Sequence, residues 1–271
     1  MLFVNELRFA LIDITRHKWR LGLWFLCFFL CIVYLEREAV PKEGIMGLPQ
    51  ALNLFFSSYT FAFPVLPLFL LFFSFGVLPF FDTARFIRYQ KRERLFLSLL
   101  SRIFWVCLIF IILYLLGGVI LGGVLSGRWD NIWLTKNGAP YLMYGDQIPL
   151  IQYYSSNVMV FRYIVTSLLL FHMIGLFAVV CYVFIKKFIY SFIIVTSVVI
   201  LDKMLHTYFA FSLINDPLSL EMTSWLIPGL FPEMIYLFGG FALVFAVILY
   251  VCLVKQDYFN DYSIDNGKEL D

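Results

Sequence analysis

The chain has 271 residues, of which 62% are hydrophobic, 20% aromatic and only 14% charged, and its formal net charge is +2. Because a soluble domain typically carries about 25% charged residues, a water-soluble fold of this length would lack the polar surface to cover so much apolar material. The small net charge also gives no reason to expect a nucleic-acid partner. The composition therefore predicts a chain that uses lipid as its solvent.

Residues 2–14 have the spacing of an amphipathic helix. Four polar side chains share one side, namely Asn5, Glu6, Arg8 and Asp13. Six apolar side chains share the other side, namely Phe3, Val4, Leu7, Ala10, Leu11 and Ile14. Such a helix lies in the plane of the membrane interface. The alternative is a simple helical extension of the span that follows.

Six apolar segments are long enough to cross a bilayer, at about 19–35, 60–81, 103–125, 160–185, 188–211 and 230–254. Because they are continuous runs and not ten-residue alternating patterns, they predict helices and not a barrel. The first follows basic residues as a signal peptide does, but Leu35-Glu36-Arg37-Glu38 replaces a small-residue cleavage site, so we expect a retained span. We predict an all-α polytopic membrane protein with a single transmembrane domain over residues 1–271.

Lysine and arginine are unevenly shared between the segments that flank these spans. Alternate segments, beginning with the N-terminal one, contain 14 of the 20 basic residues, and the other segments contain six. Since cytoplasmic segments carry such an excess, we predict that both termini are cytoplasmic. The segments 36–59, 126–159 and 212–229 are then external, and they contain no Asn-x-Ser/Thr sequon. This pattern fits a multi-pass protein of a bacterial cytoplasmic membrane.

The cysteines and short motifs give little sign of metal or catalytic chemistry. All five cysteines fall inside apolar segments, so we expect no structural disulfide. The CxxC and CxxH spacings of metal sites do not occur, and neither do the GxSG and HExxH motifs of hydrolases. We therefore assign no metal site and no catalytic residue from motifs.

The cytoplasmic segment 82–102 is the densest polar feature of the chain. Arg85, Arg88 and Arg92 fall on one narrow arc of a helix, which Asp82 is placed to cap. Lys91 and Arg94 add to its positive charge. One interpretation is a basic helix that docks into a soluble partner, and the other is an anchor that holds two spans at the headgroups. Composition favours the anchor, whereas the length of the segment favours docking, because anchoring needs only two or three charges.

The last external segment, 212–229, is apolar but interrupted by prolines. It is interpreted either as a pair of short helices that dip into the outer leaflet or as an ordinary interfacial loop. Within the spans, Gly117-Gly118, Gly122-Gly123 and Gly239-Gly240 are candidates for close helix contacts. Pro64, Pro67 and Pro79 predict a bent second span.

Four ionisable residues inside the spans are candidates for function, because charge is costly in lipid. Asp202 and His206 are four residues apart on one helix face, with Lys203 beside them, and His172 lies in the fourth span. One hypothesis is a polar patch that lines a translocation path or a proton relay. The other places residues 202–206 at the external end of the fifth span, with Lys203 reaching the headgroups, and makes His172 an interior histidine.

Together, the amphipathic N-terminal helix, the six spans, the basic segment 82–102 and the broken segment 212–229 resemble a permease subunit of an ABC-2-type transporter. The resemblance covers the whole chain as architecture. Where many family members have a Gly-Thr pair and a proline in the coupling region, this chain has only Glu93, Arg94, Ser101 and Arg102. It is therefore similar to a divergent member of the family.

The resemblance implies an exporter of an amphipathic substrate such as a peptide, lipid or toxin. The coupling residues would be Asp82, Arg85, Arg88, Lys91, Arg92 and Arg94. Because the chain has no GxxxxGK[ST] motif, a separate ABC ATPase subunit would bind ATP and magnesium. A second permease subunit, identical or not, would complete the pathway. The alternatives are an integral-membrane enzyme with a site near His172, Asp202 and His206, and a non-transporting scaffold or sensor subunit.

Overall fold

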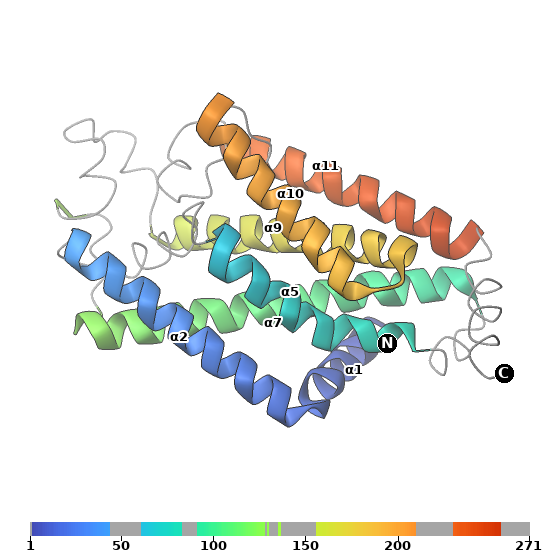
Figure 1. Cartoon of the computed structure of the whole chain (residues 1–271), viewed down its shortest axis with the longest axis horizontal. Coiled ribbons are helices and arrows are strands. Elements are labelled where there is room, and N and C mark those ends of the chain that lie inside the picture. The colour runs from blue at the N-terminus through green and yellow to red at the C-terminus, as the bar shows by residue number, and fades with distance from the viewer. Residues whose placement is uncertain are drawn as a thin grey trace.

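The computed structural model describes residues 2–43, 61–82, 91–127, 129, 135–136, 156–209 and 230–255, and these residues form helices and no strand. The long helices are α1 (Leu2–Arg16), α2 (Lys18–Glu43), α5 (Leu66–Val77), α7 (Arg92–Ser126), α9 (Ser156–Ile185), α10 (Phe188–Phe209) and α11 (Leu230–Tyr250) (Figure 1). Three short helical segments adjoin them: η1 (Phe61–Val65) and η2 (Leu78–Phe81) flank α5, and η5 (Val251–Lys255) extends α11.

Five helical segments are long and apolar enough to cross a membrane: Phe61–Phe81, Arg92–Leu121, Val160–Ile185, Phe188–Phe209 and Pro232–Val254. The prediction of apolar spanning helices is confirmed for these segments. The first expected span, 19–35, lies in α2, which forms a pair with α1 bent by 88°. The bend contradicts a straight extension of the span into residues 2–14.

The third expected span differs most from its expected limits. We expected it to begin at residue 103, but α7 is continuous from Arg92 to Ser126. The part of segment 82–102 that the structure describes from Arg92 onward is therefore the first part of this helix. The helix expected directly after Asp82, including Arg85 and Arg88, falls on residues 83–90, outside the described residues, and so does the segment 212–229.

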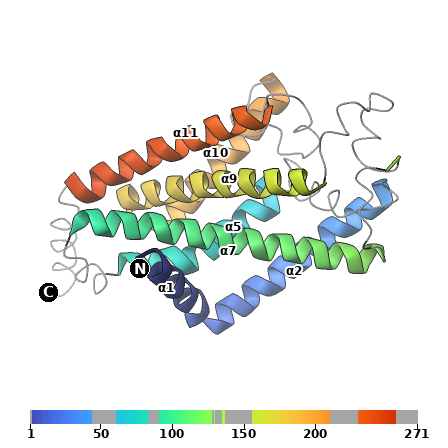
Figure 2. The same cartoon turned by 180° about the vertical axis from the view of Figure 1, so that it is seen from behind.

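The helices alternate in direction, so the helix ends gather at two ends of the bundle (Figures 1 and 2). One end contains the start of α7, the end of α5 and the connection between α9 and α10, and α1 lies toward it. This connection is sharp, and Lys186 within it has a φ of 59°. Helix α9 packs against α7, α10 and α11, and α7 also packs against α1, α2 and α5. Helices α7 and α9 thus connect the two halves of the bundle.

The prolines and glycines show where the helices change shape or approach closely. Pro64 lies in η1 and Pro79 lies in η2, so the second span changes helical geometry at both ends of α5. A Cβ on Gly117 would lie 2.7 Å from Ile32 of α2, which identifies the expected close helix contact there. Gly239 and Gly240 have no atom of the described chain within 4 Å of an added Cβ.

Candidate functional site

A buried cluster of charged groups joins α1, α5 and α7. Arg102 of α7 is 1% exposed, and its Nε donates a 2.6 Å hydrogen bond to the backbone oxygen of Gly76 in α5. Its Nη2 pairs with Asp13 of α1, and its Nη1 lies 3.8 Å from Oε2 of Glu6. Ser98 lies one turn earlier on α7, and its hydroxyl donates a hydrogen bond to Oε1 of Glu6. We call these five residues the Arg102 cluster.

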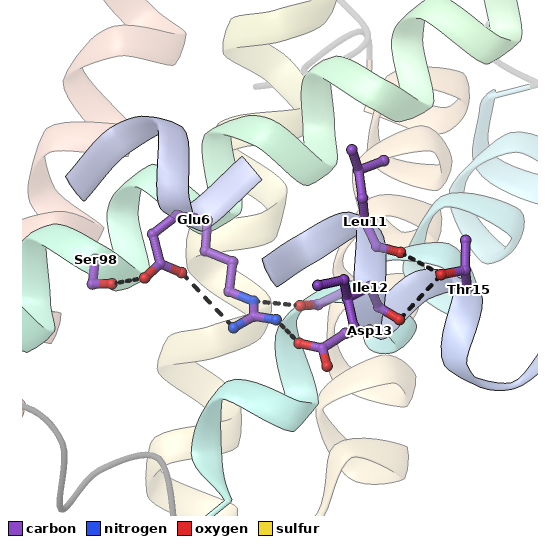
Figure 3. A network of polar contacts seen from close by, with 8 residues as sticks. Glu6, Leu11, Ile12, Asp13, Thr15 and Ser98 are labelled. Carbon is purple, nitrogen blue, oxygen red and sulfur yellow. Dashed lines mark hydrogen bonds and ion pairs between the residues drawn. The ribbon is translucent and has the colours of Figure 1, made fainter. Parts of the chain in front are cut away.

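Local geometry explains why each member of the cluster faces the same point. Glu6 and Asp13 are seven residues apart, so they lie two turns apart on one face of α1, and Figure 3 shows both side chains within one network. Ser98 and Arg102 share a face of α7 because they are four residues apart. The acidic side chains therefore reach α7 from one stripe of α1, which also buries Ala10 and Ile14.

The end of α5 supplies the backbone acceptor. An N–H in a 3₁₀ turn bonds to the carbonyl three residues before it, and the residue three after Gly76 is Pro79, which has no N–H. The change from α-helix to the 3₁₀ segment η2 thus leaves the Gly76 oxygen available to Arg102. A side chain at position 76 would also be obstructed, because a Cβ there would lie 2.5 Å from Cγ2 of Val106.

The electrostatics of the cluster depend on the single guanidinium. Two buried carboxylates, of Glu6 and Asp13, face Arg102, whose Cζ also lies 5.6 Å from the ring centroid of Phe80. A buried charge is tolerated only when it is paired and hydrogen-bonded. The cluster therefore holds α1 against the bundle. Removing the guanidinium alone, or the two carboxylates alone, should lower the stability of the fold, because the remaining charge would stay buried without its partner charge.

This arrangement corrects the expected orientation of the amphipathic helix. Glu6 and Asp13 share the expected polar side with Asn5 and Arg8, but both acids are buried, while Asn5 is exposed. The outward position of Arg8 agrees with the expectation. The reason is tertiary: Arg102 lies in α7 opposite the boundary between the polar and apolar sides of α1. The sequence does contain two acids seven residues apart and an arginine at the edge of an apolar span, but we did not predict that they pair.

The expected coupling residues that the structure describes lie at the start of α7 and the end of η2. Lys91, Arg92 and Arg94 are exposed, and Lys91 is the N-cap of α7 in an extended conformation, without a side-chain cap. Arg92 donates a 3.4 Å hydrogen bond from Nη1 to the backbone oxygen of Val254. Asp82 is exposed at the residue after η2. These charged groups therefore lie on the surface at one end of the bundle.

The expected pathway residues lie on two helices, His172 on α9 and the other three on α10. The ring of His172 in α9 lies edge-on to Phe104 of α7, at 6.4 Å between centroids. Its Nδ1 is buried and has no hydrogen-bond partner among the residues that the structure describes. Asp202 is buried in α10, and Lys203 beside it is half-buried. His206 belongs to α10, but its side chain is outside the described set. Within the described residues no group of three metal-binding side chains occurs.

The apolar helices define a multi-pass helical membrane protein. The Arg102 cluster holds its N-terminal helix against the spans. No protein-family model, curated protein or solved structure matches this chain.

Proposed function

We propose that this chain is the transmembrane permease subunit of an ATP-driven exporter of ABC-2 type. In this proposal both termini and the start of α7 face the cytoplasm of a bacterial cell. A separate ATPase binds ATP and magnesium and acts on the segment 82–102. Two permease subunits enclose a path for an amphipathic substrate such as a peptide, lipid or toxin.

The observation that carries the proposal is the position of α1 on α7. Helix α1 turns 88° away from α2, as expected of a helix that lies in the membrane surface while α2 crosses. It contacts α7 between Ser98, which bonds to Glu6, and Trp105, whose Nε1 donates a 2.8 Å hydrogen bond to the backbone oxygen of Phe3. Tryptophan is typical of the membrane interface, so this stretch of α7 is where we place the surface.

The basic start of α7 then projects beyond the membrane. At a rise of 1.5 Å per residue, Arg92 is about 10–20 Å farther along the helix axis than the Ser98–Trp105 stretch. Lys91, Arg92 and Arg94 are all exposed there, within reach of a soluble subunit. This placement also explains why α7 has 35 residues, when about 20 suffice to span a bilayer.

The continuity of α7 suggests how force from an ATPase would reach the spans. A displacement at Arg92 is carried along one unbroken helix to the apolar span, because no described hinge interrupts α7. The Arg102 cluster fixes α1 and the end of α5 to the same part of α7. These three elements would therefore move together when the ATPase changes conformation.

The test is to purify the chain from its native membrane in mild detergent and identify what remains bound. We expect an ATPase subunit to copurify, and to be lost when Arg85, Arg88 and Arg92 are changed to glutamate. The matched control reverses three charges in the segments expected to be external, at Lys42, Arg128 and Lys136, and should retain the ATPase. Recovery of the chain alone, under conditions that preserve known complexes, would contradict the proposal and favour a membrane enzyme.

A further inference from the structure

The outer surface of the bend between α1 and α2 is more positive than the sequence of this region suggests. Residues 2–34 contain four basic residues, Arg8, Arg16, Lys18 and Arg20, and two acidic residues, Glu6 and Asp13. All four basic side chains are exposed, whereas both acids are buried against Arg102. Within the described residues, no ion pair joins any of the four cations to an acid. The charge that faces outward is therefore entirely positive.

Residues 16–20, which we call the basic elbow, are held from both sides. On the α1 side, the Arg102 cluster fixes Asp13 three residues before the elbow. On the α2 side, Trp24 is buried and its Nε1 donates a 2.9 Å hydrogen bond to the backbone oxygen of Leu68 in α5. Because α1 and α2 are both held in place, the backbone that carries Arg16, Lys18 and Arg20 is fixed before a ligand binds. Less conformational entropy is therefore lost on binding.

The surroundings of the elbow are those of a membrane surface. Trp19 lies between two of the cations and is 89% exposed, and Ile12 and Leu23 are exposed on the two arms. Exposed aromatic and aliphatic groups beside lysine and arginine suit the boundary between headgroups and acyl chains. An acidic soluble protein would complement the charge, but it would leave the adjoining apolar surface of α1 and α2 unexplained.

We propose that the basic elbow binds anionic phospholipid headgroups of one bilayer leaflet in preference to zwitterionic ones. Arg16, Lys18 and Arg20 attract the phosphate groups, and Trp19 lies at headgroup level. The buried pairing of Glu6 and Asp13 with Arg102 removes from the outer surface the two acids that would repel these lipids. This inference holds whether or not the chain is a permease subunit, because its evidence is the charge and position of the elbow.

The test measures lipid retention by native mass spectrometry on the purified full-length chain. The protein in detergent is mixed with equal amounts of phosphatidylglycerol and phosphatidylcholine, and the bound lipids are counted for each variant. We expect wild type to retain mainly phosphatidylglycerol. Each basic residue near an anionic surface contributes about 1 kcal/mol, or about fivefold. The variant Arg16→Gln/Lys18→Gln/Arg20→Gln should therefore lower the phosphatidylglycerol preference by about a hundredfold.

The matched control removes the same number of charges from the start of α7, as Lys91→Gln/Arg92→Gln/Arg94→Gln, and should keep the preference. The variant Arg16→Lys/Arg20→Lys retains the charges and should keep it as well. If the triple elbow variant does not purify as a single species, Lys18→Gln alone is measured, with a fall of about fivefold expected.

Three results would overturn the inference. Equal retention of the two lipids by wild type would show that the elbow does not select charge. An equal loss in the α7 control would show that the preference belongs to the whole basic end. Unchanged lipid retention with loss of a bound acidic protein would assign the elbow to a protein partner.

Discussion

Replacing Arg102 with methionine removes the only basic side chain of the Arg102 cluster and leaves the carboxylates of Glu6 and Asp13 buried. The guanidinium donates a 2.6 Å hydrogen bond to the backbone oxygen of Gly76 and forms an ion pair with Asp13, and its Nη1 lies 3.8 Å from Oε2 of Glu6. Removing one side of such a buried pair costs about 3–5 kcal/mol. Since 1 kcal/mol shifts the unfolding temperature of a chain of this size by a few degrees, we expect a decrease of about 10 °C.

The cysteines provide the assay. Cys107, Cys181 and Cys252 are buried and free, so a thiol-reactive fluorophore reports heat-induced unfolding of the protein in detergent. The exposed Arg94 on the same helix is the control, and Arg94→Met should change stability by less than about 0.5 kcal/mol.

A charge-neutral variant separates electrostatics from packing. In Arg102→Met/Glu6→Gln/Asp13→Asn no charged side chain of the cluster remains, so this triple variant should recover most of the stability lost by Arg102→Met alone. The reasoning would be refuted if Arg102→Met matched wild type. It would also be refuted if the triple variant were as unstable as the single one, because the loss of stability would then come from the lost side-chain volume and not from carboxylates that have lost the guanidinium.

Two further substitutions test how α5 is held by its neighbours, with the same unfolding assay. Gly76→Ala places a Cβ 2.5 Å from Cγ2 of Val106 and should lower the free energy of unfolding by about 1–3 kcal/mol. Gly240→Ala, whose Cβ meets no atom of the described residues within 4 Å, should have little effect, and equal effects of the two substitutions would contradict the close approach at Gly76. Trp24→Phe keeps an aromatic ring but removes the 2.9 Å hydrogen bond to Leu68, so it should cost about 1 kcal/mol, and an unchanged unfolding temperature would show that this bond contributes nothing.

Much of the secondary structure could be predicted because its cause is local. Apolar runs of about 20 residues form helices in lipid whatever surrounds them, and the expected spans 60–81, 160–185 and 188–211 lie close to the observed helices. The start of α7 could not be placed, because hydropathy marks where a span enters lipid and not where its helix begins. Polar residues from Arg92 onward continue the same helix and leave no apolar signal.

The charged residues were harder to interpret than the apolar ones, because their meaning depends on what packs beside them. The positions of Lys91 and Arg94 are exposed, and the half-buried His172 lies against Phe104 of another span. By contrast, the same amphipathic pattern that predicted a helix over residues 2–14 gave the wrong environment for Glu6 and Asp13.

By itself, the sequence determined that this chain is helical and passes through a membrane several times, because composition and run length fix how much apolar surface must leave water. Only the tertiary structure decided that Glu6 and Asp13 face inward and that the elbow shows only positive charge outside. Pairing Arg102 with acids 89 or more residues earlier in the chain requires α1 to fold back across α5 and α7. No local pattern specifies such a contact, because it depends on the 88° bend and on how closely three helices approach.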